Sequence, residues 1–115
     1  MSIKRHGAGT RMSGAVVHNN TVYLAGQVAS DPSAGVKGQT EQVLKKIDAL
    51  LAGVGSDKSK LLSATVYLAN MGTYDEMNAA WDAWVDPGNT PGRATVEAKL
   101  ASPKYLVEIA AIAAL

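Results

Sequence analysis

The sequence contains no cysteine, no phenylalanine and no long hydrophobic run. Without cysteine, a disulfide framework, a nucleophilic thiolate and the common thiolate sites for zinc and iron–sulfur clusters are excluded. No stretch approaches the roughly 20 apolar residues of a transmembrane helix, and no apolar segment follows the basic N-terminus as in a signal peptide. We therefore expect a cytoplasmic protein with no membrane association.

Charge of either sign is not in excess. Lysine and arginine number 11 against 10 aspartate and glutamate residues, and the formal net charge is +1. Scattered, balanced charges do not predict the basic surface that binds nucleic acid or anionic lipid. The 115 residues suffice for one domain, which we expect over residues 1–115, but not for two. Abundant Ala, Val and Leu predict a core of small side chains that oligomerisation can extend.

The first half of the chain predicts a hairpin followed by a helix. Two β-branched runs, residues 14–18 and 21–28, flank Asn19-Asn20, and asparagine tolerates the positive φ of tight hairpin turns. The proline and glycines of "DPSAGVKG" predict a loop over residues 31–38. The next segment, "QTEQVLKKIDALLAGVG", is expected to be a helix that stops at its last glycines. Its apolar side chains follow helical spacing: Val43, Leu44, Ile47, Leu50, Leu51 and Val54.

The second half predicts a strand, a helix and two more strands. "LLSATVYLA" alternates, and the side chains expected to face the core are Leu62, Ala64, Val66 and Leu68. "TYDEMNAAWDAW" opens with Thr73 and has Glu76 three positions later, which predicts a capping box. The inward stripe of this helix is Met77, Ala80, Trp81 and Trp84. The strands "RATVEAK" and "YLVEIAAIAAL" follow, joined at Ser102-Pro103.

The resulting order, β-β-α-β-α-β-β, is typical of an α+β fold with helices on one face of a mainly antiparallel or mixed sheet. The last strand is apolar at both odd and even positions, so both of its faces should be covered. The helices can cover one face. The other is covered either by a second copy of the chain or by an overlying loop.

Two charges stand out in these final strands. Arg93 follows "NTPG" at the start of one strand, where its planar fork is suited to a carboxylate or phosphate. The alternative is an exposed arginine without a specific role. Glu108 lies between Val107 and Ile109, and buried carboxylates are rarely left unpaired. It marks either a functional site or a structural ion pair.

Other candidates carry less information. Gly26, inside a strand, permits close approach of a ligand or marks a bulge. Asn78 lies off the apolar stripe of its helix and is either a polar contact or a solvated position. His6 and His18 are isolated and lack the spacing of metal ligands.

At these residues the chain resembles the Rid family of reactive intermediate deaminases, also called the YjgF family. The resemblance runs over nearly the whole chain. It is carried by "VYLAGQVA", "QTEQVLKKIDALLAGVG" and, most specifically, "PGRATVEAKLASPKYLVEIAAIA". "RMSGAV" and "MNAAWDAW" are similar to a branch of short members distinct from the best-studied deaminases.

The resemblance implies a chorismate-mutase-like fold, a homotrimer, and ligand sites in the clefts between subunits. It also implies a reaction, the hydrolysis of 2-imino acids and their enamine tautomers to 2-keto acids and ammonia. No metal or organic cofactor is implied, and the expected partners are small 2-imino and 2-keto acids.

Residue roles follow from the resemblance one at a time. Arg93 matches the arginine that grips the substrate carboxylate, and Glu108 matches the glutamate that positions the attacking water or the substrate nitrogen. Thr95 matches a position that contributes backbone groups, Gly26 a glycine–glutamine strand, and Asn78 a helix asparagine near the pocket. Met12 stands where the better-known deaminases have a tyrosine, and the adjacent Arg11 is a candidate second anion contact.

Three functions are therefore compared. The first is an imine deaminase, and the second is a non-catalytic module that binds a small keto or amino acid through Arg93. The third is an RNA-directed activity of the kind described for some relatives, which the balanced charge disfavours.

Overall fold

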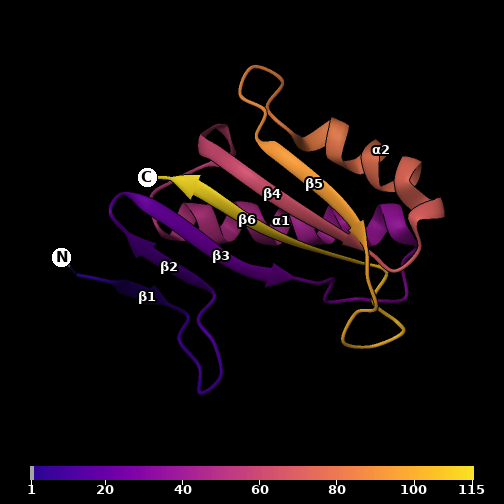
Figure 1. Cartoon of the computed structure of the whole chain (residues 1–115), viewed down its shortest axis with the longest axis horizontal. Helices are drawn as coiled ribbons and strands as arrows, with labels where there is room; N and C mark the ends of the chain where they lie inside the picture. The colour runs from indigo at the N-terminus through magenta and orange to yellow at the C-terminus, as the bar shows by residue number, and fades with distance from the viewer. Residues whose placement is uncertain (1) are drawn as a thin grey trace.

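The computed structural model describes residues 2–115 as a six-stranded sheet with its two α-helices on one face (Figure 1). The strand order is β1-β2-β3-β6-β4-β5. Only β4 and β5 run parallel, and the other neighbours are antiparallel. The bounds are β1 Lys4–His6, β2 Ala15–His18, β3 Thr21–Gln27, α1 Val36–Gly53, β4 Leu61–Leu68, α2 Tyr74–Trp84, β5 Gly92–Glu97 and β6 Val107–Ala114. Short 3₁₀ turns at Lys58–Lys60 and Met71–Thr73 precede β4 and α2.

The predicted α+β class and element order are confirmed, with one strand added. Asn19 and Asn20 have φ of 52° and 60°, so they form the expected tight turn between β2 and β3. The extra strand is β1, which pairs with β2 at the sheet edge. All three of its residues are exposed, so it has no apolar alternation that sequence reasoning could detect.

Helix α1 begins earlier than predicted. It starts at Val36 after Gly35, so Gly38 lies inside the helix and the predicted loop over residues 31–38 is too long. Val36 is 5% exposed and packs in the hydrophobic core, so the first turn of the helix is fixed by its own core contact. The predicted stripe is otherwise confirmed: Val43, Leu44, Ile47 and Leu51 are buried, while Leu50 and Val54 are partly buried against the core.

Strand β4 departs from simple alternation at its start. Leu61 is 6% exposed and Leu62 is 53% exposed, so the prediction that Leu62 faces the core is wrong. The pairing with β6 shifts register between Leu61 and Ser63, and such an irregularity exchanges the faces of the residues before it. From Ala64 onward the predicted pattern holds.

Helix α2 packs on α1 and has the predicted inward stripe. Met77, Ala80 and Trp81 are buried, and Trp84 Nε1 donates a hydrogen bond to Asp48 Oδ2 of α1 at 2.9 Å. The predicted capping box is absent. The Thr73 hydroxyl instead donates to the Asn70 carbonyl, because a 3₁₀ turn already precedes the helix. No helix in residues 2–115 has the length and apolarity needed to cross a membrane.

Strand β6 separates two environments. Val107, Ile109, Ala111 and Ala113 are buried beneath the helices, while the alternate residues Glu108, Ala110, Ile112 and Ala114 are half-buried on the opposite face. Within residues 2–115 no helix covers this open face, because α1 passes behind the sheet in Figure 1 and the buried residues of α1 and α2 share one core with the buried residues of β6. Neither helix therefore provides the second cover that the apolar pattern of β6 predicts.

Candidate functional site

Glu108 lies on the open face of the sheet, within a cleft. It is paired across β6 and β4 with Tyr67, and the cleft has a volume of about 460 Å³. Its walls come from β3, β4, β6 and the loop after β5: Gly26, Tyr67, Ala98, Lys99, Leu100, Ala101, Glu108 and Ala110. A half-buried carboxylate thus faces a space large enough for a small organic acid.

Gly26 leaves room for the Glu108 side chain. The register between β3 and β6 shifts between Leu24 and Gln27, so the expected bulge is present at this glycine. A Cβ atom on residue 26 would overlap the carboxylate of Glu108. The close approach that a glycine permits is therefore used here by the candidate catalytic carboxylate.

Arg93 lies on the other face of the sheet. It pairs with Ala64, which is buried beneath the helices, and its guanidinium extends to α2. Its Nη2 donates to the Tyr74 hydroxyl at 3.2 Å, and Nη1 lies 3.9 Å from Met77 Sδ. Its Cζ lies 5.0 Å from the ring centre of Trp81.

The two candidate charges do not meet within one chain. They lie on opposite faces, on strands separated by β4, so Arg93 and Glu108 of one chain are not an ion pair. A site that uses both side chains at once must take them from different copies of the chain.

The remaining candidates are spread over the molecule. Thr95 follows Arg93 by two residues on the helix-facing side of β5 and pairs with Val66. Asn78 is half-buried on α2. Arg11 and Met12 are exposed in the loop between β1 and β2, at the opposite end of the sheet order from β5. A single chain does not assemble these residues into one pocket.

The structure adds residues that sequence reasoning missed. Tyr67 and Lys99 line the Glu108 cleft, and a second cleft of about 550 Å³ shares Lys99, Leu100 and Ala101 with it. The loop that forms both clefts is held by Gln39 of α1, which is fully buried and accepts a hydrogen bond from Leu106 N at 3.0 Å. In the sequence, Gln39 could have been recognised as a polar residue on the apolar side of the α1 helix.

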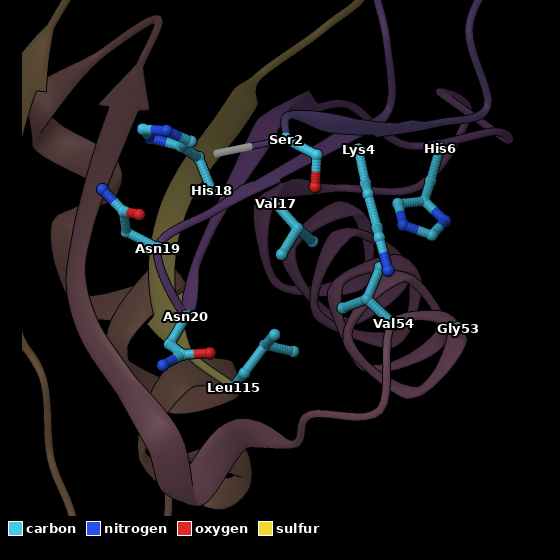
Figure 2. Close-up of a pocket in the computed structure, with 10 residues that line it drawn as sticks. All are labelled: Ser2, Lys4, His6, Val17, His18, Asn19, Asn20, Gly53, Val54 and Leu115. Atoms are coloured by element: carbon cyan, nitrogen blue, oxygen red, sulfur yellow. The ribbon is translucent and has the colours of Figure 1, made fainter.

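Another concavity, of about 600 Å³, shares no lining residue with these two clefts and contains none of the predicted site residues. Figure 2 shows it between β1, the β2–β3 turn and the end of α1, with the Lys4 side chain extending towards Val54. His6 and His18 both line it. In residues 2–115, no three His, Cys, Asp or Glu side chains are grouped so that they could hold a metal ion.

Comparison with known proteins agrees with this architecture. The family model described as "Endoribonuclease L-PSP" matches residues 3–115. The chain is 52% identical to a RutC family protein of Haemophilus ducreyi, over 91% of this chain and 90% of that protein. The crystal structure of a YjgF family member from Neisseria meningitidis has 46% identity and a TM-score of 0.97, covering 99% of this chain and 95% of that one.

The fold and the match to the family model define the class: the chain belongs to the family that includes the YjgF and Rid proteins. The predicted resemblance is confirmed. One relative has a chemically specific name, a rat "2-iminobutanoate/2-iminopropanoate deaminase" that is 31% identical over 88% of this chain and 77% of that protein.

Proposed function

We propose that this protein hydrolyses 2-imino acids and their enamine tautomers to 2-keto acids and ammonia. The observation that carries the proposal is the Glu108 carboxylate, which faces an open cleft and occupies space that only a glycine at position 26 leaves free. The name of the rat relative supports the same reaction class. Glu108 holds the attacking water, and Arg93 binds the substrate carboxylate.

The chemistry requires few groups. Water adds to the electrophilic imine carbon, forming a C–O bond, and a proton moves to nitrogen. The C–N bond then breaks, which leaves the keto acid and ammonia. Glu108 accepts and returns the proton, while a bidentate contact from Arg93 fixes the carbon relative to the water. Because imines hydrolyse readily in water, a modest acceleration is useful.

We further propose that the working unit is a homotrimer in which Arg93 of one subunit meets Glu108 of its neighbour. The opposite placement of the two side chains in one chain supports a shared site. The uncovered apolar residues of β6 support association through the open face. Thr95, Asn78 and Arg11 then provide further substrate contacts.

The first test measures 2-keto acid release from 2-imino acids formed in situ by an amino-acid oxidase, with semicarbazide competing for the imine. We expect Arg93→Ala to lower kcat/KM by about 10- to 100-fold, since it removes a charge-assisted contact. We expect Glu108→Gln to lower kcat by about 100-fold or more. Equal release with and without wild-type protein, across several imines, would exclude the deaminase.

The alternative is a module that binds a small keto or amino acid without turnover. It predicts Arg93-dependent binding of 2-keto acids in calorimetry with no acceleration in the semicarbazide assay. The family model's description also names a ribonuclease. The net charge of +1 offers no broad electrostatic attraction for RNA, and salt-dependent RNA cleavage by the purified protein would overturn our proposal.

A further inference from the structure

The guanidinium of Arg93 lies against one face of α2. Tyr74, Met77 and Trp81 stand at positions i, i+3 and i+7, which share a helix face. Arg93 Cζ lies 5.7 Å from the Tyr74 ring centre and 5.0 Å from that of Trp81, both within the range of cation–π attraction. The Tyr74 hydroxyl accepts a hydrogen bond from Nη2 at 3.2 Å.

These contacts engage two of the N–H donors of the guanidinium. Arginine has five N–H donors in a fixed plane. Tyr74 takes one and Met77 Sδ is a weak acceptor for another, so the other donors remain for a ligand. A guanidinium in contact with aromatic rings can still offer its N–H edges to a carboxylate in a bidentate contact.

The three side chains around the Arg93 guanidinium differ in how exposed they are to solvent. Met77 is 0% exposed and Trp81 6%, whereas Tyr74 is 40% exposed. The buried Met77 and Trp81 contact the guanidinium from the core side, and Tyr74 is the most exposed of the three residues. A side chain already held in its binding conformation loses less entropy when a ligand arrives.

We propose that Tyr74, supported by Trp81, is a positioning residue that sets the Arg93 guanidinium in the orientation that receives the substrate carboxylate. This inference rests on the proposed role of Arg93 as the carboxylate contact. Tyr74 acts through Arg93 and takes no part in proton transfer. Its loss therefore weakens substrate binding and leaves the chemical step unchanged.

The test uses the intact protein, with 2-oxobutanoate as the binding probe and imines formed in situ as substrates. Tyr74→Phe keeps the ring and removes the hydroxyl. We expect it to raise both Kd and KM about 3- to 10-fold with kcat unchanged, as for one lost hydrogen bond. Tyr74→Leu, which also removes the ring, should weaken binding further.

Thr73→Val is the matched control, because it removes a neighbouring hydroxyl that bonds to Asn70 rather than to Arg93. We expect wild-type Kd and KM from it. The ¹⁵N signals of the Arg93 side chain provide a readout without ligand: Tyr74→Phe should speed rotation about the guanidinium bonds, and Thr73→Val should not. Melting temperatures of all variants separate positioning from general destabilisation.

Each outcome is decisive. Unchanged Kd and KM in Tyr74→Phe, together with lost binding in Arg93→Ala, would overturn the positioning role and leave the proposed function standing. Full binding by Arg93→Ala would overturn both. A fall in kcat with unchanged KM in Tyr74→Phe would contradict a role in binding orientation.

Discussion

At the residue scale, the contact between Gly26 and Glu108 connects the backbone conformation of β3 with the position of the candidate catalytic carboxylate. The bulge in β3 brings the glycine beneath the carboxylate, and a side chain at this position would compete with Glu108 for the same space. Sequence reasoning left a ligand and a bulge open as explanations for Gly26. The structure has the bulge, and the group that approaches the glycine is the protein's own carboxylate.

Gly26→Ala tests this contact. The added methyl must displace Glu108 or β3, and we expect kcat/KM to fall about 10- to 100-fold, the range for an approximately 1 Å misplacement of a reacting group. Gly53→Ala is the control, since a Cβ there has no atom within 4 Å. Full activity of Gly26→Ala in the semicarbazide assay would show that the position of Glu108 does not limit the reaction.

At the element scale, Gln39 joins the start of α1 to the loop before β6. Its Nε2 lies 3.0, 3.1 and 3.1 Å from the carbonyl oxygens of Pro32, Ala34 and Lys104. Its Oε1 accepts from Leu106 N. One fully buried amide thus satisfies backbone groups of two loops, one of which lines the Glu108 cleft.

Gln39→Leu should therefore destabilise the fold by about 2–4 kcal/mol, because it leaves several buried backbone groups without partners. Urea unfolding measures this loss. Gln42→Leu on the same helix is the control. It removes exposed bonds to Asp31 and should cost about 1 kcal/mol or less. A Gln39→Leu variant as stable as the control would contradict the linking role.

Asp57, at the turn before β4, makes a pH-dependent contribution to the stability of the folded protein. Hydrogen bonds from the Ser59 hydroxyl and backbone N–H lower the pKa of this carboxyl below its ordinary 3.8. The ionised form is favoured in the folded state. Its stabilisation is therefore present above about pH 4 and is lost as the pH falls through the folded-state pKa. In urea unfolding, Asp57→Ala should be less stable than wild type at pH 7, and the difference should shrink towards pH 3. A constant difference would contradict this account.

At the scale of the whole molecule, the open face of the sheet is the surface available for association. Tyr23 is 46% exposed on β3, and Ile112 of β6 lies half-buried beside it in the pairing of the two strands. We expect ultracentrifugation to give three times the 11.9 kDa chain mass for wild type. Ile112→Glu should dissociate the assembly, because it buries an unpaired charge. Ala52→Glu, on the exposed side of α1, should not, and a monomeric wild type would exclude the trimer.

A shared site also predicts complementation between inactive variants. Arg93→Ala and Glu108→Gln each lack one side chain of every site. If each site combines Arg93 of one subunit with Glu108 of its neighbour, equal mixing after reversible dissociation should restore about one quarter of wild-type activity. Two variants that remain inactive when co-assembled would place both groups of a site in one subunit, against the geometry of the single chain.

Local patterns in the amino-acid sequence were enough to predict the α+β class, the Asn19-Asn20 turn and the buried stripes of both helices, and to single out Arg93 and Glu108 as candidate site residues. Periodicity and turn preference are properties of short segments, so they can be read without the fold. They failed at β1, at Leu62 and at the start of α1, where pairing with a distant strand or contact with the core determines the structure. The sheet face of each side chain depends on register between strands far apart in the chain. For that reason, only the folded structure separates Arg93 from Glu108, brings Gly26 beneath the carboxylate and surrounds the guanidinium with Tyr74 and Trp81.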